Sequence, residues 1–75
     1  MPELSADAFC RLGVEQEAQG RADQAEASFR KALYLDPRHH EAVTHLARLV
    51  EGRGADGEAK VLWSRARRLE TGGAR

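Results

Sequence analysis

The chain has 75 residues, with 12 Lys and Arg balanced by 12 Asp and Glu, and a single cysteine. A chain of this length forms one small domain with little room for a substrate cavity, and one cysteine excludes an intramolecular disulfide. It contains no apolar run of about 18 residues and starts without the features of a secretory signal, so we expect a cytoplasmic protein that does not span a membrane.

Two amphipathic helices are predicted in the first half of the chain. The first covers residues 6–19, because apolar side chains recur at helical spacing after the N-cap residue Ser5, and Gly20 ends it. The second covers residues 22–35 and stops before Pro37, since proline cannot continue the hydrogen-bond ladder of a helix.

Two more helices are predicted in the second half. One covers residues 40–51 and is broken by Gly52 and Gly54, and the other covers residues 56–70. Residues 71–75 are expected to form a frayed tail. No alternating strand pattern competes with these helices, so the predicted fold class is all-α.

The chain matches itself at an offset of 34 residues, without insertion or deletion. Laying residues 6–39 over residues 40–73 gives the identical pairs Ala8/Ala42, Leu12/Leu46, Glu17/Glu51, Gly20/Gly54, Ala25/Ala59, Ala32/Ala66 and Leu35/Leu69. A fixed period of this length indicates two copies of one supersecondary unit, and such units stack into binding scaffolds. The expected organisation is an N-terminal extension, two repeats and a disordered tail, over residues 1–5, 6–39, 40–71 and 72–75.

The order of small and large side chains in both units resembles the tetratricopeptide repeat. In the first unit the resemblance rests on Phe9, Leu12, Gly13, Gly20, Ala25, Phe29, Ala32, Leu33, Leu35 and Pro37. In the second unit it rests on Val43, Leu46, Ala47, Gly54, Ala59, Trp63, Ala66 and Leu69. Gln16 departs from the pattern, which usually has an aromatic residue there, and Thr71 stands where a proline would close the second unit. The resemblance implies two antiparallel helix-turn-helix units.

The same resemblance implies a protein–protein interaction module. Tetratricopeptide arrays bind a peptide or a partner helix in a concave groove that the first helix of each pair lines. Carried over position by position, the groove residues are Asp7, Cys10, Val14, Glu17, Glu41, Thr44, His45, Arg48 and Glu51. The expected module has no catalysis and no cofactor of its own.

A narrower resemblance concerns residues 32–42, residues 45–47 and residues 65–69. These segments look like the C-terminal repeats of bacterial CheR-type chemotaxis methyltransferases, which join a receptor-glutamate methyltransferase domain to a short tetratricopeptide segment. The alternative function is therefore the regulatory tail of an S-adenosylmethionine-dependent methyltransferase whose catalytic domain lies outside this chain.

Residues that suggest metal or nucleophilic chemistry are poorly placed for it. His40 and His45 come near the zinc-binding pattern His-Glu-x-x-His, but their separation of five residues turns the two rings roughly 140° apart on a helix. Cys10 has no histidine close in sequence to serve as its base. We therefore expect no metal ligands and no catalytic residues.

Charge is unevenly spread along the chain. Residues 1–37 hold four Lys and Arg against seven Asp and Glu, a net charge of −3, and residues 38–75 carry a net charge of +3. This difference favours head-to-tail contacts or an acidic partner, and the near-neutral composition leaves nucleic-acid binding through Arg65, Arg67 and Arg68 as a minor alternative. Two repeats are fewer than usually suffice for an isolated array, so we expect self-association or docking onto the rest of a longer protein.

Overall fold

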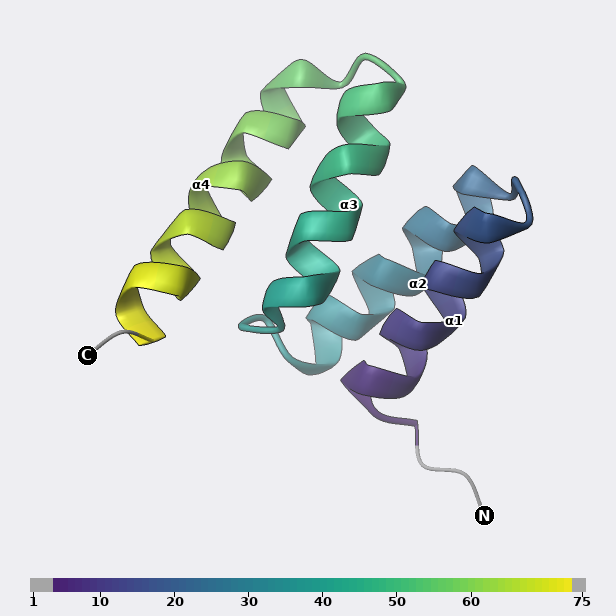
Figure 1. Cartoon of the computed structure of the whole chain (residues 1–75), viewed down its shortest axis with the longest axis horizontal. Helices are drawn as coiled ribbons and strands as arrows, with labels where there is room; N and C mark the ends of the chain where they lie inside the picture. Colours follow the sequence, from purple (N-terminus) through teal and green to yellow (C-terminus); the bar gives the residue numbers. More distant parts are fainter. Residues whose placement is uncertain (1–3, 74–75) are drawn as a thin grey trace.

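The computed structural model describes residues 4–73 and contains two antiparallel helical hairpins (Figure 1). The helices are α1 (Ala6–Ala18), α2 (Ala22–Leu35), α3 (His40–Gly52) and α4 (Asp56–Gly73). Every regular element in this described part of the chain is helical, which confirms the all-α prediction. None of these helices is long and apolar enough to cross a membrane.

The helices begin and end close to the predicted residues, except at the C-terminal end. The bounds of α2 agree with the prediction, while α1 ends one residue earlier and α3 one residue later. Helix α4 continues to Gly73, so residues 72 and 73 of the expected disordered tail are helical. With Thr71 in place of a proline, nothing breaks the ladder there, and the Thr71 hydroxyl donates to the carbonyl of Arg67 at 3.0 Å. The rest of the expected tail and residues 1–3 of the N-terminal extension lie outside the described residues.

The turn inside each hairpin is built in the same way. Gly20 and Gly54 have positive φ angles of 77° and 86°, a conformation that favours glycine over other residues. The next residue in each turn donates its amide back into the preceding helix, Arg21 to Gln16 and Ala55 to Val50, both at 2.9 Å. The glycine breaks predicted from the sequence are therefore helix ends of one repeated geometry.

The first helix of each hairpin is capped by a different side chain at the equivalent position. Ser5 Oγ accepts a hydrogen bond from the amide of Ala8 at 3.1 Å, as the sequence predicts. His39, 34 residues later, accepts from the amide of Ala42 through Nδ1, also at 3.1 Å. A histidine ring therefore performs the capping role of the serine, and this fixes the start of α3.

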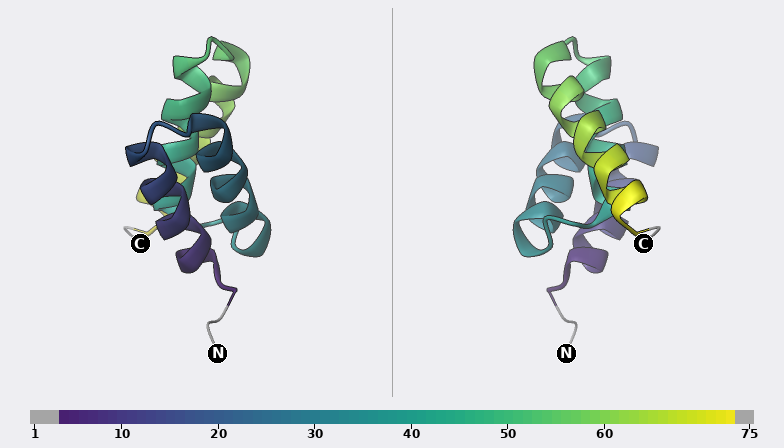
Figure 2. Two further views of the ribbon diagram at one scale, coloured as in Figure 1. Left: turned by 90° about the vertical axis from the view of Figure 1, so that its right-hand side faces the viewer. Right: turned by 90° about the vertical axis from the view of Figure 1, so that its left-hand side faces the viewer.

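The core lies where α2 packs against both α1 and α3, and α3 in turn packs against α4 (Figure 2). Phe29 fills its centre with no exposed surface, and the His45 ring stacks on it at 5.1 Å between centroids. Gly13 makes room for this ring, because a Cβ at position 13 would lie 2.7 Å from Phe29 Cε1. The absence of a side chain at Gly13 thus allows α1 to approach α2 closely.

Gln16, which departs from the usual aromatic residue, makes a polar contact inside the first hairpin. The buried Ser28 hydroxyl donates to Gln16 Oε1 at 2.5 Å. This hydrogen bond satisfies a hydroxyl that would otherwise be costly to bury. The second hairpin has Val50 and Leu62, both buried, at the equivalent positions.

An ion network joins the two hairpins through their side chains. Arg53, in the turn between α3 and α4, donates to both carboxylate oxygens of Glu26 on α2, at 2.8 and 2.9 Å. Arg30 pairs with Glu26, one helical turn before it on α2, at 2.9 Å, and with Glu58 on α4 at 2.6 Å. Hydrogen bonds from the two guanidinium groups, that of Arg53 above all, lower the pKa of Glu26 to about 2.

Candidate partner-binding groove

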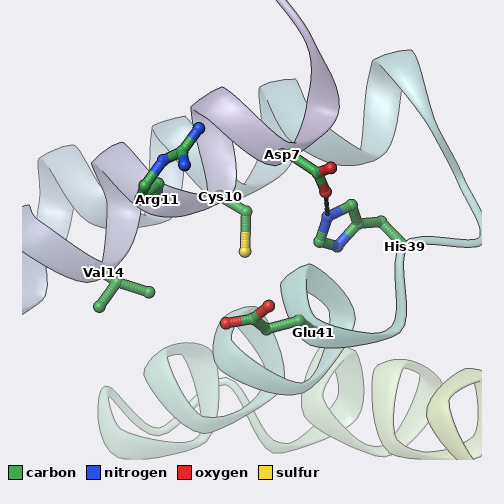
Figure 3. Close-up of a pocket in the computed structure, with 6 residues that line it drawn as sticks. All are labelled: Asp7, Cys10, Arg11, Val14, His39 and Glu41. Carbon is green, nitrogen blue, oxygen red and sulfur yellow. Dashed lines mark hydrogen bonds and ion pairs between the residues drawn. The ribbon is translucent and has the colours of Figure 1, made fainter.

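A shallow groove of about 350 Å³ opens between the first helices of the two hairpins (Figure 3). Its lining residues are Asp7, Cys10, Arg11 and Val14 from the α1 side and His39 and Glu41 from the α3 side. Of the predicted groove residues, Asp7, Cys10, Val14 and Glu41 meet there. His39 and Arg11 also line the groove but are absent from the set of groove residues predicted from the sequence.

His39 ties the two sides of the groove together. Its Nε2 lies 2.7 Å from Asp7 Oδ1 on α1, while its Nδ1 caps α3. The ring is held from both sides and only 11% of its side chain is exposed. A capping position directly before a predicted helix is the sequence signal that would have identified this residue.

Cys10 forms the buried floor of the groove. Only 3% of the residue is exposed. Burial, together with the nearby carboxylates of Glu41 and Asp7, raises the pKa of its thiol from 9.0 to about 11. The thiol is therefore neutral near pH 7 and is a poor nucleophile.

His45 extends the groove along α3. Its ring lies against Phe29, its Nδ1 is 3.4 Å from Glu17 Oε1, and its Nε2 is 3.8 Å from Glu41 Oε2. Arg48 Nη2 lies 2.9 Å from the same Nδ1. The predicted residues Glu17, His45 and Arg48 thus form one connected polar rim next to the groove.

Thr44 and Glu51 lie elsewhere, beside Trp63 of α4. Thr44 lines a separate hollow with Trp63, and its hydroxyl is bonded to the carbonyl of His40 at 3.0 Å. Glu51 accepts a hydrogen bond from Trp63 Nε1 at 3.3 Å. The structure does not bring these two predicted residues into the groove between α1 and α3.

The histidines of α3 have separate partners. His40 Nε2 approaches Glu70 Oε2 of α4 at 3.2 Å, at angles unsuited to a hydrogen bond, whereas His45 faces α1. Within residues 4–73, no three histidine, cysteine or acidic side chains are grouped closely enough to hold a metal ion. The rings of His40 and His45 therefore face different helices, α4 and α1.

The chain is similar to a short part of two bacterial proteins that are named as methyltransferases. The chain is 44% identical over 64 residues to the protein named probable biofilm formation methyltransferase WspC of Pseudomonas aeruginosa, and equally to the protein of that name from Pseudomonas putida. The matched segment covers 85% of this chain and 15% of each relative, so the chain spans about one seventh of their length. No solved structure matches it.

The first hairpin matches a known repeat family. The family model described as Tetratricopeptide repeat matches residues 6–39, which are the first hairpin and the turn that follows it. The match begins and ends at the residues that the 34-residue offset predicts. The second hairpin has the same turn, the same capping position and small residues at the equivalent positions of its helix contact. The first unit therefore matches the tetratricopeptide repeat over its whole length, and the second unit repeats its architecture.

Proposed function

We propose that this chain is a protein–protein interaction module whose groove between α1 and α3 receives a peptide or a helix of a partner protein, with no catalysis and no cofactor of its own. The observation that carries this proposal is the groove itself. It lies between corresponding helices of two stacked repeats, and its floor is a buried thiol whose raised pKa makes it a poor nucleophile. Shallow grooves of this kind suit an extended segment better than a small substrate.

The charges around the groove favour a basic residue in the partner. The side chains of Asp7 and Glu41 are 83% and 65% exposed and stand on opposite sides of Cys10. A lysine or arginine placed between them gains two charge-assisted contacts above an apolar floor. Peptides with an acidic residue at that point should be rejected.

Selection from a random peptide library displayed on phage tests the groove directly. We expect the enriched peptides to share a basic residue, and the Asp7→Asn/Glu41→Gln variant to bind them at least about tenfold more weakly, since two charged contacts are lost. Asp23→Asn, an equally conservative change at an exposed position of α2, is the matched control and should bind normally. Selected peptides that bind both variants equally well would show that the groove is not the binding site.

The second candidate function is the regulatory tail of a methyltransferase that works in the cytoplasm. It is supported by the 44% identity to the two WspC proteins over 64 residues. On this proposal the S-adenosylmethionine site belongs to a domain outside the chain. Calorimetric titration of the chain with S-adenosylmethionine should give no heat of binding, and saturable binding would contradict the assignment.

We also propose that the chain associates with itself. The second hairpin carries Trp63 partly exposed on a surface that a further repeat would cover in a longer array. Sedimentation velocity at micromolar to high micromolar concentration should therefore show species larger than a monomer. A single monomeric species throughout that range would contradict self-association.

A further inference from the structure

The outer side of the second hairpin is a surface that none of the helices within residues 4–73 covers. Two hollows, of about 330 and 500 Å³, meet at Trp63, and Glu51, Lys60 and Arg67 surround it. In the right-hand view of Figure 2, α4 stands in front and no other described helix lies over it. We call the surface formed by these four residues the Trp63 face.

The first hairpin shows what normally covers such a face. Phe29 occupies the position equivalent to Trp63 and is fully buried, because α3 lies over it. The contact is made by His45, whose ring is tilted by only 8° from the ring of Phe29, and which approaches Glu17 at 3.4 Å. The second repeat therefore packs on the first through three side chains: the Phe29 ring, the His45 ring stacked on it, and the Glu17 carboxylate beside His45.

The 34-residue offset maps this unit onto the Trp63 face. Phe29 becomes Trp63 and Glu17 becomes Glu51, and these two side chains are already in contact, at 3.3 Å. The covering residue, His45, corresponds to Arg11 in the first hairpin. The first helix of another copy therefore presents an arginine where α3 presents a histidine.

We propose that a second copy of this chain stacks head to tail on the Trp63 face, with its α1 in the place that α3 takes on the first hairpin, so that Arg11 of the second copy lies over Trp63 and pairs with Glu51. This rests on the proposed self-association and specifies its surfaces and register. A planar guanidinium stacks well on an indole ring, and tryptophan is the most favourable aromatic partner for a cation.

Helix α1 is suited to this contact. Arg11 is exposed, and Figure 3 shows its guanidinium turned away from Cys10 and Glu41. Leu12 is 42% exposed, whereas its counterpart Leu46 on the covered face of α3 is only 2% exposed. An apolar side chain that is buried in the second unit is thus left partly in solvent in the first.

Net charge favours the same orientation. The half of the chain that contains α1 and α2 carries −3, and the half that contains α3 and α4 carries +3, so a head-to-tail arrangement brings unlike halves together. A symmetric dimer through two Trp63 faces would instead bring two positive halves together. Head-to-tail contacts do not close on themselves in general, so the weight-average mass should keep rising with concentration instead of levelling at a dimer.

Charge-swap variants test the register by sedimentation equilibrium. Arg11→Glu places a carboxylate against Glu51 of the neighbouring copy, and Glu51→Arg places a guanidinium against Arg11, so each should weaken association at least about tenfold. The double variant in one chain restores the attraction and should recover most of the lost affinity. Arg38→Glu, an exposed residue in the turn between the hairpins, is the matched control and should associate like the wild type.

Fluorescence gives an independent measurement, because Trp63 is the single tryptophan of the chain. Its emission should change with protein concentration in the wild type and the double variant, and should stay constant in the Arg11→Glu variant over the same range. These two variants differ at Glu51, next to the indole, so each is compared with its own emission at high dilution.

The possible outcomes separate this proposal from the others. A mass that levels at a dimer and does not respond to either charge swap retains self-association but overturns the head-to-tail register. A monomer at all concentrations overturns both. Because Glu51 lies outside the groove between α1 and α3, Glu51→Arg should keep wild-type affinity for library-selected peptides. Peptide binding and self-association are therefore tested independently, and either proposal can fail without the other.

Discussion

The two hairpins share a backbone plan but differ in what surrounds their large aromatic residue. Phe29 is fully buried between Gly13 of α1 and His45 of α3, whereas Trp63, at the equivalent position, is only partly buried. The turn glycines, the capping positions and the small residues on the helix contacts are equivalent in both units. The difference therefore comes from the neighbouring unit: the first repeat is completed by α3, and the second has no described helix in that place.

The interiors differ as well. The first hairpin contains the Gln16–Ser28 hydrogen bond where the second has Val50 and Leu62. It also has Gly13 where the second has Ala47. The first unit thus uses a specific polar pair and a missing side chain to accommodate its buried aromatic ring, while the second has apolar side chains at the equivalent positions.

The largest expected effect comes from truncating the two aromatic residues. Phe29→Ala empties the centre of the core and should lower the free energy of unfolding by about 3–5 kcal/mol, which is enough to unfold much of so small a domain. Trp63→Ala removes a partly exposed side chain and should cost about half as much, since less surface is buried there. Urea unfolding followed by circular dichroism measures both. Equal losses in the free energy of unfolding would mean that Trp63 is as deeply buried as Phe29.

The next effect tests the close contact at Gly13. Gly13→Ala places a Cβ 2.7 Å from the buried Phe29 ring, so one of them must move, and we expect a loss of about 1–3 kcal/mol. Gly57→Ala, in the first turn of α4 and with no atom within 4 Å of the new Cβ, is the control. It should be neutral or stabilise by up to about 1 kcal/mol, through helix propensity. If both changes stabilise the protein, α1 does not approach the Phe29 ring as closely at position 13 as the structure shows.

A smaller effect is expected at the polar pair. Ser28→Ala leaves the Gln16 oxygen without its partner and should cost about 1 kcal/mol. Replacing both residues, as Gln16→Val/Ser28→Ala, makes the site apolar like that of the second hairpin and should restore most of the loss. A double-mutant cycle, which compares Gln16→Val and Ser28→Ala with the double variant, measures the coupling between the two side chains. A double variant that loses as much as the sum of the single variants would show that the pair is not coupled.

The repeat plan could be predicted from the sequence because it depends on local and periodic signals. Glycines at 20 and 54, the proline at 37 and the small residues fix the helix ends and contacts within each unit. The groove was predicted less completely. His39 was missed because its role depends on contact with Asp7, 32 residues away, and Thr44 was placed in the groove because nothing in the sequence states on which side of α3 the next helix lies.

The smallest expected effect concerns the ion network, which also distinguishes the two hairpins, since Lys60 and Ser64 stand in the second where Glu26 and Arg30 stand in the first. The pKa of Glu26 is lowered from 4.5 to about 2, so its contribution to stability is present above pH 4.5 and is lost as the pH falls from 4.5 towards 2. Because the side chains of Arg30 and Arg53 are 44% and 48% exposed, solvent screens these pairs, and we expect about 1 kcal/mol.

The measurement is the free energy of unfolding in urea at pH 6 and at pH 3, for the wild type and for Glu26→Gln. The variant should be less stable at pH 6 and should lose less stability between the two values, because its side chain does not titrate. Sodium chloride at 1 M should reduce the difference between the two proteins at pH 6, since exposed ion pairs are screened over about 3 Å at that ionic strength. Asp23→Asn, in the first turn of the same helix but outside the network, keeps the pH response of the wild type on this account. A Glu26→Gln variant with an unchanged pH response would mean that the guanidinium groups hold the two hairpins together without depressing the pKa of the carboxyl between them.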